Sequence, residues 1–373
     1  MQPPVPAPRQ SALCADLPST VPFVGPEAQQ RARGRPFRAR IGANECAFGP
    51  SPRAVAAMAT AAAESWMYGD PENHDLKAAI AAHHRVAPGN VMVGEGIDGL
   101  FGYAVRLFLD PGDTVVTSRG AYPTFNFHVT GYGGQLQFAA YEQDRENPPA
   151  LLDLARAHSA RMIYFANPDN PMGSWWPATE VQTFIDRLPP GVVLCLDEAY
   201  SDFAPPGTLP ALDVENRQVL RLRTFSKAYG LAGARIGYII GESSVIRSFD
   251  KIRNHFGMTR MAQAGALAAL ADQAHLSEVL GSVAAARAEI GAIATANGLA
   301  ALPSATNFVA IDCGRDGAFA RRVLAALIAR DIFVRMPGVV PLDRCIRVSA
   351  GVPADLAVFA EALPEALAEA RRD

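Results

Sequence analysis

Lysine is scarce in this chain of 373 residues, where Lys77, Lys227 and Lys251 are the only lysines among 34 basic residues. Any chemistry that needs a lysine amine therefore has three candidates. Charged residues make up 19% of the chain and the net charge is −3, against a charged share of roughly 25% in an average protein. Because the chain has no basic field, its composition argues against nucleic acid or a membrane surface as a partner.

Paired cysteines and long apolar runs are missing as well. The five cysteines are widely spaced and form no C-x-x-C pair, which argues against disulfides and against any metal site. Residues 1–16 hold no apolar run typical of a signal peptide, and no stretch of about 18 apolar residues predicts a membrane span. With 49% hydrophobic residues, the chain is expected to be a soluble globular protein of the cytoplasm with reduced thiols.

Short apolar runs alternate with helical patterns in the middle of the chain, which predicts an α/β fold with a mostly parallel sheet. Helices on both sides of this sheet would make three layers. We expect this large domain to span residues 51–275. Residues 1–50 read as an arm that joins a smaller α+β domain over residues 276–373. The strands expected in the large domain are Val91–Val93, Thr114–Thr117, Met162–Ala166, Val192–Leu196, Val219–Leu222 and Ile236–Ile240.

The segment from Thr224 to Arg235 carries the strongest chemical signal. Lys227 follows a predicted strand, where a parallel sheet is expected to bind ligands. A lysine amine in such a place can form a Schiff base with a carbonyl cofactor, and Thr224, Ser226 and Arg235 could hold a phosphate. The alternative is a solvated lysine at the start of a helix.

Two more segments follow predicted strands. Gly94 to Gly99 reads G-x-G-x-x-G, and the helix that starts there could offer free N–H groups to an anion. A structural turn would read the same, and the acidic residue of a dinucleotide site is not at the end of the next strand. Asp197 ends another strand, where a buried carboxylate needs a cation such as a protonated pyridine nitrogen, or else caps a helix.

Three side chains near the predicted strand ends could contact such a ring. Tyr200 could reach a phenolic oxygen on it. The loop from Asn167 to Gly173, with two Asn-Pro pairs, could hold the Asn170 amide in place, although a turn without function would look alike. Phe125 could stack on the ring, but a lone aromatic side chain is more often part of the core.

These segments, in this order, resemble the class I/II aminotransferases of the pyridoxal phosphate fold type I, and the histidinol-phosphate aminotransferase group in particular. The pattern S-K-x-x-G-L-A-G-x-R-x-G from Ser226 to Gly237 and D-E-A-Y at Asp197–Tyr200 are its most specific parts. The resemblance runs from Asn44-Glu45 to Arg347. It implies a pyridoxal 5'-phosphate-dependent transaminase of amino-acid biosynthesis that works as a homodimer with shared active sites.

The resemblance also assigns roles. Lys227 would hold the cofactor as an internal aldimine and move the proton, Asp197 would pair with the pyridinium nitrogen, and Phe125 would stack on the ring. Tyr200 and Asn170 would bond the ring oxygen. The phosphate would be held by Gly96, Ile97, Asp98, Thr224, Ser226 and Arg235. Tyr68 would reach into the neighbouring subunit's site, and the substrate would be bound by Arg347, Arg335 and Asn44.

Departures from the family pattern leave the amino donor open. Phe48 replaces a tyrosine whose hydroxyl can help to hold the phosphate of histidinol phosphate, and Met172 replaces the threonine of N-P-T-G. The expected donor is histidinol phosphate or an aromatic or other amino acid, and the acceptor a 2-oxo acid such as 2-oxoglutarate. A decarboxylase or lyase related to threonine-phosphate decarboxylase would use the same lysine, aspartate and phosphate residues.

Overall fold

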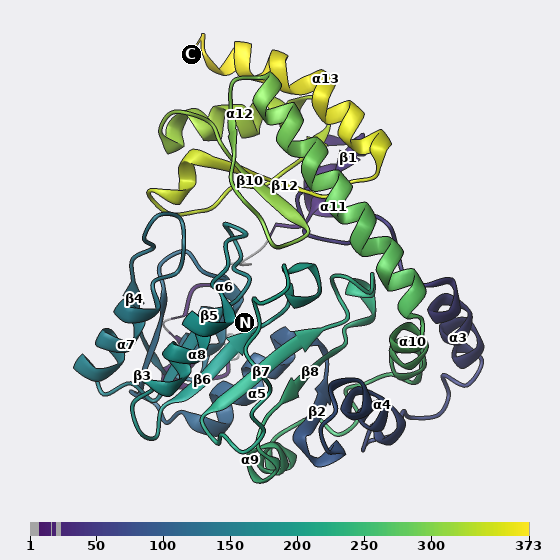
Figure 1. The fold of residues 1–373 in the computed structure, drawn as a ribbon, viewed down its shortest axis with the longest axis vertical. Helices are drawn as coiled ribbons and strands as arrows, with labels where there is room; N and C mark the ends of the chain where they lie inside the picture. The colour runs from purple at the N-terminus through teal and green to yellow at the C-terminus, as the bar shows by residue number, and fades with distance from the viewer. Residues whose placement is uncertain (1–6, 16, 20–23, 373) are drawn as a thin grey trace, which may run out of the picture.

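The computed structural model describes residues 7–15, 17–19 and 24–372. The expectations for residues 1–6, 16 and 20–23 of the arm lie outside these ranges. Two parts are visible in Figure 1, a larger lower part built on a wide sheet and a smaller upper part. Both parts mix helices with strands, so the fold is of the α/β class, as predicted.

The larger part contains a seven-stranded sheet in the order β2-β8-β7-β6-β5-β3-β4. Strand β8 runs antiparallel to both of its neighbours, and all other pairs are parallel. The sheet is therefore mostly parallel, which confirms the prediction. Its strands are β2 (Val91–Gly94), β3 (Thr114–Ser118), β4 (Gln135–Ala139), β5 (Met162–Ala166), β6 (Val193–Asp197), β7 (Val219–Thr224) and β8 (Gly237–Ile240).

Alternate side chains of these strands pack into two separate cores. Ile163 and Phe165 of β5 face one layer of helices, whereas Met162 and Tyr164 face the other. This period of two is what a strand buried on both faces requires. The first layer holds α7 (Pro148–Ala157) and α8 (Ala178–Asp186), and the second holds α5 (Gly96–Phe108) and α6 (Pro123–Gly131).

Helices at one end of the large sheet pack on one another. Helix α3 (Pro52–Ala62) begins at a capped end, because Ser51 accepts a hydrogen bond from the backbone N–H of Arg53 and Pro52 takes the first helical position. It packs against α10 (Arg260–Ala271). The remaining helices of the N-terminal and large parts are α1 (Ala12–Ala15), α2 (Pro26–Arg33), α4 (His74–His84) and α9 (Ser243–Ser248).

The smaller part has an antiparallel sheet in the order β12-β10-β9. Strand β1 (Ala39–Arg40) of the N-terminal arm pairs in parallel with β11 (Ile332–Phe333) beside it. The first 50 residues thus reach the smaller part before the large sheet begins (Figure 1). The other elements here are β9 (Ala300–Ala301), β10 (Phe308–Asp312), β12 (Cys345–Ser349), α11 (Gln273–Ala296), α12 (Gly317–Ala329) and α13 (Pro353–Ala370).

Helix α11 bears on the expectation that the chain has no membrane span. By length and composition alone this alanine-rich helix of 24 residues could cross a membrane. It contains no unbroken apolar run of that length, because isolated polar residues such as Glu278 interrupt it. In the structure its face from Leu276 to Ala294 is buried against β10 and α13.

Candidate active site

A cavity of about 680 Å³ opens at the carboxyl ends of β5, β6 and β7. This is the edge at which parallel sheets bind ligands. The segment 335–339 of the smaller part and Gly25 and Pro26 of the arm also line the cavity. Three stretches that lie far apart in the sequence therefore meet around one space.

One end of the cavity is built to hold an anion. The first turn of α5 brings Ile97 and Asp98 to the wall, and Thr224, Ser226 and Arg235 face them. Backbone N–H groups at a helix start have no partner within the helix and attract negative charge. The Thr224 hydroxyl donates to Ser226 Oγ at 2.9 Å, and Arg235 Nη1 lies 3.4 Å from the same oxygen.

Gly96 supports this anion site from behind. It has a φ of +78°, and a Cβ atom at this position would lie 2.4 Å from Nη2 of Arg235. A side chain would therefore strain the backbone and push Arg235 out of place. Gly96 itself is not among the residues that line the cavity.

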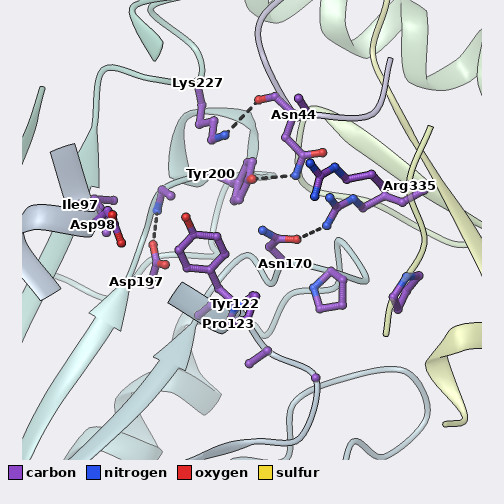
Figure 2. Close-up of a pocket in the computed structure, with 18 of the residues that line it drawn as sticks. Asn44, Ile97, Asp98, Tyr122, Pro123, Asn170, Asp197, Tyr200, Lys227 and Arg335 are labelled. Carbon is purple, nitrogen blue, oxygen red and sulfur yellow. Dashed lines mark hydrogen bonds between the residues drawn. The ribbon is translucent and has the colours of Figure 1, made fainter. Parts of the chain in front are cut away.

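Asp197, the last residue of β6, places its carboxylate in the cavity wall (Figure 2). Its Oδ1 accepts the backbone N–H of Ala199 at 2.9 Å, and its Oδ2 accepts the hydroxyl of Tyr164 at 2.8 Å. Burial raises the pKa of Asp197 to about 6, although both hydrogen bonds act in the opposite direction. Asp197 forms no ion pair with any residue in the described ranges, so the site offers a buried carboxylate to a cationic ligand.

Lys227 lies across the cavity from Asp197. Its Nζ donates to the backbone carbonyl of Asn44 at 3.0 Å and sits 5.5 Å from the centroid of the Tyr200 ring. Burial lowers the pKa of Lys227 to about 8, and the positive charges of Arg347 and Arg235 add to this effect. A neutral amine, the form that attacks carbonyl groups, is therefore accessible near neutral pH.

Hydrogen bonds also orient the polar groups between Lys227 and the smaller part. Asn44 Nδ2 donates to the Tyr200 hydroxyl at 3.0 Å, and Arg347 Nη1 donates to Oδ1 of Asn170. Arg335 and Arg347 belong to paired segments, since their backbones exchange hydrogen bonds, and both line the cavity.

Of two aromatic residues with a predicted role, Phe125 lies elsewhere than expected, whereas the role predicted for Tyr68 concerns a second subunit. Phe125 is fully buried and does not line the cavity; its ring stacks on that of Tyr164, with centroids 4.7 Å apart. Tyr122 lines the cavity instead, because α6 begins at Pro123 and leaves Tyr122 at its N-cap. Tyr68 is 77% exposed and lies beside Phe256 on the surface, away from the cavity of its own chain.

Several cavity residues escaped the sequence reading. Tyr122 carried a weak signal, a Tyr-Pro pair at a helix start, whereas Tyr164, which contacts Asp197 from behind the cavity, lies in a buried strand and looked like ordinary core. Arg119, Gly25 and Pro26 line the cavity without any motif around them. Most of the predicted residues do meet there: Asn44, Ile97, Asp98, Asn170, Asp197, Tyr200, Thr224, Ser226, Lys227, Arg235, Arg335 and Arg347.

This donor set fits pyridoxal 5'-phosphate. The buried carboxylate of Asp197 has no cationic partner among the described residues, the start of α5 and Arg235 form a site for a phosphate, and Lys227 offers an amine of lowered pKa. The cofactor has a protonated pyridine ring to pair with Asp197, a phosphate group for the site at α5 and Arg235, and an aldehyde that can react with Lys227. None of them requires a metal ion, and the described residues contain no cluster of potential metal ligands.

Comparison with known proteins agrees with this chemistry. The family model "Aminotransferase class I and II" matches residues 40–363. Histidinol-phosphate aminotransferase 1 of Mesorhizobium japonicum is 35% identical over 337 residues, which are 88% of this chain and 90% of that protein.

Solved structures agree as well. The crystal structure of histidinol-phosphate aminotransferase from Sinorhizobium meliloti, in complex with pyridoxal-5'-phosphate, has 52% identity and a TM-score of 0.94, and the match covers 96% of this chain and 98% of that one. An aspartate aminotransferase of Thermus thermophilus with maleate, 21% identical, shares the fold with a TM-score of 0.76 over 91% of this chain and 94% of its own. The chain therefore belongs to the class I and II aminotransferases and is an enzyme that depends on pyridoxal 5'-phosphate.

Proposed function

We propose that this aminotransferase takes its amino group from histidinol phosphate and passes it to a 2-oxo acid such as 2-oxoglutarate. The observation that carries this proposal is the pair Arg335 and Arg347, which enter the cavity from adjacent segments. Burial and the neighbouring Arg335 lower the pKa of Arg347 to about 10, with the negative charges nearby acting in the opposite direction. The positive charges of Arg335 and Arg347 disfavour each other, and an anionic ligand bound to both would offset this repulsion.

The charge balance of the cavity supports a substrate that carries a phosphate. Five basic side chains line it, from Arg119, Lys227, Arg235, Arg335 and Arg347, against the three carboxylates of Glu45, Asp98 and Asp197. The cofactor phosphate would occupy the anion site at Arg235. We assign the phosphate of the donor or the carboxylates of the acceptor to Arg335 and Arg347, which line the same cavity. The relatives named above also carry the name histidinol-phosphate aminotransferase.

The geometry supports the following residue roles. Bound pyridoxal phosphate supplies an electron sink for the electron pair that remains when the substrate carbon loses its proton. Lys227 Nζ, oriented by the Asn44 carbonyl, would take up and return that proton, since its pKa of about 8 allows both states. Asp197 would keep a positive charge on the ring nitrogen, and Tyr122 would cover the ring.

Two polar groups would hold the ring oxygen. Tyr200 would donate its hydroxyl proton while Asn44 Nδ2 holds the hydroxyl oxygen, and the Asn170 amide would be fixed by Arg347. A decarboxylase or lyase on the same fold is less favoured, because the relatives cited above are named as aminotransferases.

The surface around Tyr68 supports a homodimer. Trp66, Tyr68 and Phe256 are large apolar side chains with exposed fractions of 82%, 77% and 54%. Exposed apolar side chains that lie together, as Tyr68 and Phe256 do, are typical of subunit interfaces. We place Tyr68 in the active site of a second copy, and the enzyme in the cytoplasm, where its five free cysteines would stay reduced.

The half-reaction of the purified enzyme tests this proposal. Histidinol phosphate should bleach the visible absorbance of the bound cofactor at far lower concentrations than histidinol, the matched compound without a phosphate. Equal bleaching by histidinol, or a preference for an aromatic amino acid, would overturn histidinol phosphate as the donor. Release of carbon dioxide from threonine phosphate would instead establish the decarboxylase.

A further inference from the structure

Tyr164 is a buried polar residue to which the reaction described above gives no role. It lies on β5, where Ala166 pairs with Asp197 of β6 in the register of the sheet. Tyr164 is two residues before Ala166, so both side chains leave the strand on the same face as Asp197. Its hydroxyl donates to Oδ2 of Asp197 at 2.8 Å, behind the cavity rather than in it.

The Tyr164 ring is held in place by packing. Its side chain is fully buried. Phe125 stacks on one face with an interplanar angle of 24°, and Phe101 meets it edge-on with the centroids 5.5 Å apart. Burial, with the negative charge of Asp197, raises the pKa of Tyr164 well above its ordinary value, so the hydroxyl keeps its proton and remains a donor.

The Asp197 carboxylate is thus held by two donors that differ in kind. The backbone N–H of Ala199 fixes Oδ1 and cannot be removed by a side-chain substitution, whereas Tyr164 fixes Oδ2 through one hydroxyl. Both hydrogen bonds favour the ionised form of the Asp197 carboxylate, whereas burial favours the protonated form. The other titratable groups that interact with Asp197 include Lys227, Glu198, Glu146, Asp169, Cys195, Tyr122 and Tyr200.

We propose that Tyr164 is a positioning residue, which keeps Asp197 ionised and turned toward the ring nitrogen of the cofactor, while Phe125 holds Tyr164 in place. An ionised Asp197 can pair with a protonated ring nitrogen, and a protonated Asp197 cannot. The stacking predicted for Phe125 therefore exists, but its partner is Tyr164 rather than the cofactor. The inference depends on the cofactor and on no particular amino donor.

Tyr164→Phe tests the proposal, since it removes one oxygen and leaves the ring. A hydrogen bond to a charged group is worth about 1.5–3 kcal/mol, so we expect Y164F to weaken the binding of pyridoxal 5'-phosphate at pH 7 by roughly 10- to 100-fold. The affinity is measured by equilibrium dialysis of the cofactor-free enzyme. Tyr238→Phe is the matched control, because its buried hydroxyl contacts His84 and not Asp197.

A deaza analogue of the cofactor, with carbon in place of the ring nitrogen, separates positioning from a merely structural role. Y164F should bind this analogue as the unmodified enzyme does, because no ring nitrogen is left for Asp197 to hold. In the Asp197→Asn background, Y164F should add little further loss for the natural cofactor. Equal losses for cofactor and analogue, or full affinity of Y164F for pyridoxal phosphate, would overturn the proposal.

Discussion

Glu198 is the centre of a buried charge network whose loss should destabilise the whole fold. It follows Asp197 in the sequence, and its side chain is completely buried. It accepts hydrogen bonds from Nε of Arg221 at 3.0 Å and from Nε of Arg223 at 2.9 Å. Glu198→Ala would leave two largely buried guanidinium groups without their carboxylate.

The expected size of the effect follows from these contacts. Removing one partner of a buried ion pair costs about 3–5 kcal/mol in the free energy of unfolding. Arg221 would keep its bonds to the carbonyls of Pro210 and Ala211, so we expect a loss near 3 kcal/mol, the low end of this range. Glu361→Ala is the control, since Glu361 and its partner Arg38 are 69% and 51% exposed, and such pairs contribute about 0–1 kcal/mol.

The thermal midpoints of both variants and of the unmodified enzyme, measured at one cofactor concentration, provide the comparison. Burial alone would raise the pKa of Glu198, but Arg221 and Arg223 lower it below the ordinary value. The stabilisation is therefore complete above about pH 4.3, the pKa of a free glutamate, and is lost as the pH falls through the lowered pKa. A midpoint for E198A that equals that of E361A at pH 7 would refute the reasoning.

Three further predictions concern the cavity. Gly96→Ala should weaken cofactor binding at least about tenfold, because its Cβ would meet Arg235 and strain the backbone. In the control Gly99→Ala, the Cβ would lie 3.5 Å or more from its neighbours, so the cofactor affinity measured by equilibrium dialysis should not change. Uptake of the cofactor by the cofactor-free enzyme should accelerate with pH up to about 8 and then level off, since the Lys227 pKa is about 8; stopped-flow absorbance measures this, and acceleration that continues beyond pH 10 would contradict it. Arg335→Gln should raise KM for histidinol phosphate by roughly tenfold or more, the value of one lost charged hydrogen bond, with little effect on histidinol; equal increases would rule out a phosphate contact.

Much of the fold could be predicted because its strands are buried on both faces. The strand Met162–Ala166, for example, is predicted with the bounds that the structure has. The strand β4 was missed because it lies at the edge of the sheet, where its residues from Gln135 to Phe138 are exposed or half-buried. Such a strand lacks the continuous apolar run that identified the others.

The residues of the site divide in a similar way. Lys227 and Asp197 lie in motifs where a polar side chain follows an apolar strand, and this contrast is visible in the sequence. The choice between Tyr122 and Phe125 depends on where α6 begins, which shifts the direction of each side chain and cannot be read from residue types. Contacts such as that between Tyr164 and Asp197 arise only when two strands take a particular register.

The amine of Lys227 has a main-chain carbonyl, that of Asn44, as its hydrogen-bond partner. Asn44 has a φ of +56°, and its carbonyl also accepts a hydrogen bond from Asn307 Nδ2 at 3.1 Å. Every amino acid carries the same carbonyl, so replacing the side chain at position 44 would not erase this acceptor. The bend in the chain, rather than the identity of this side chain, therefore orients the reactive amine, whereas the Asn44 amide serves the Tyr200 hydroxyl.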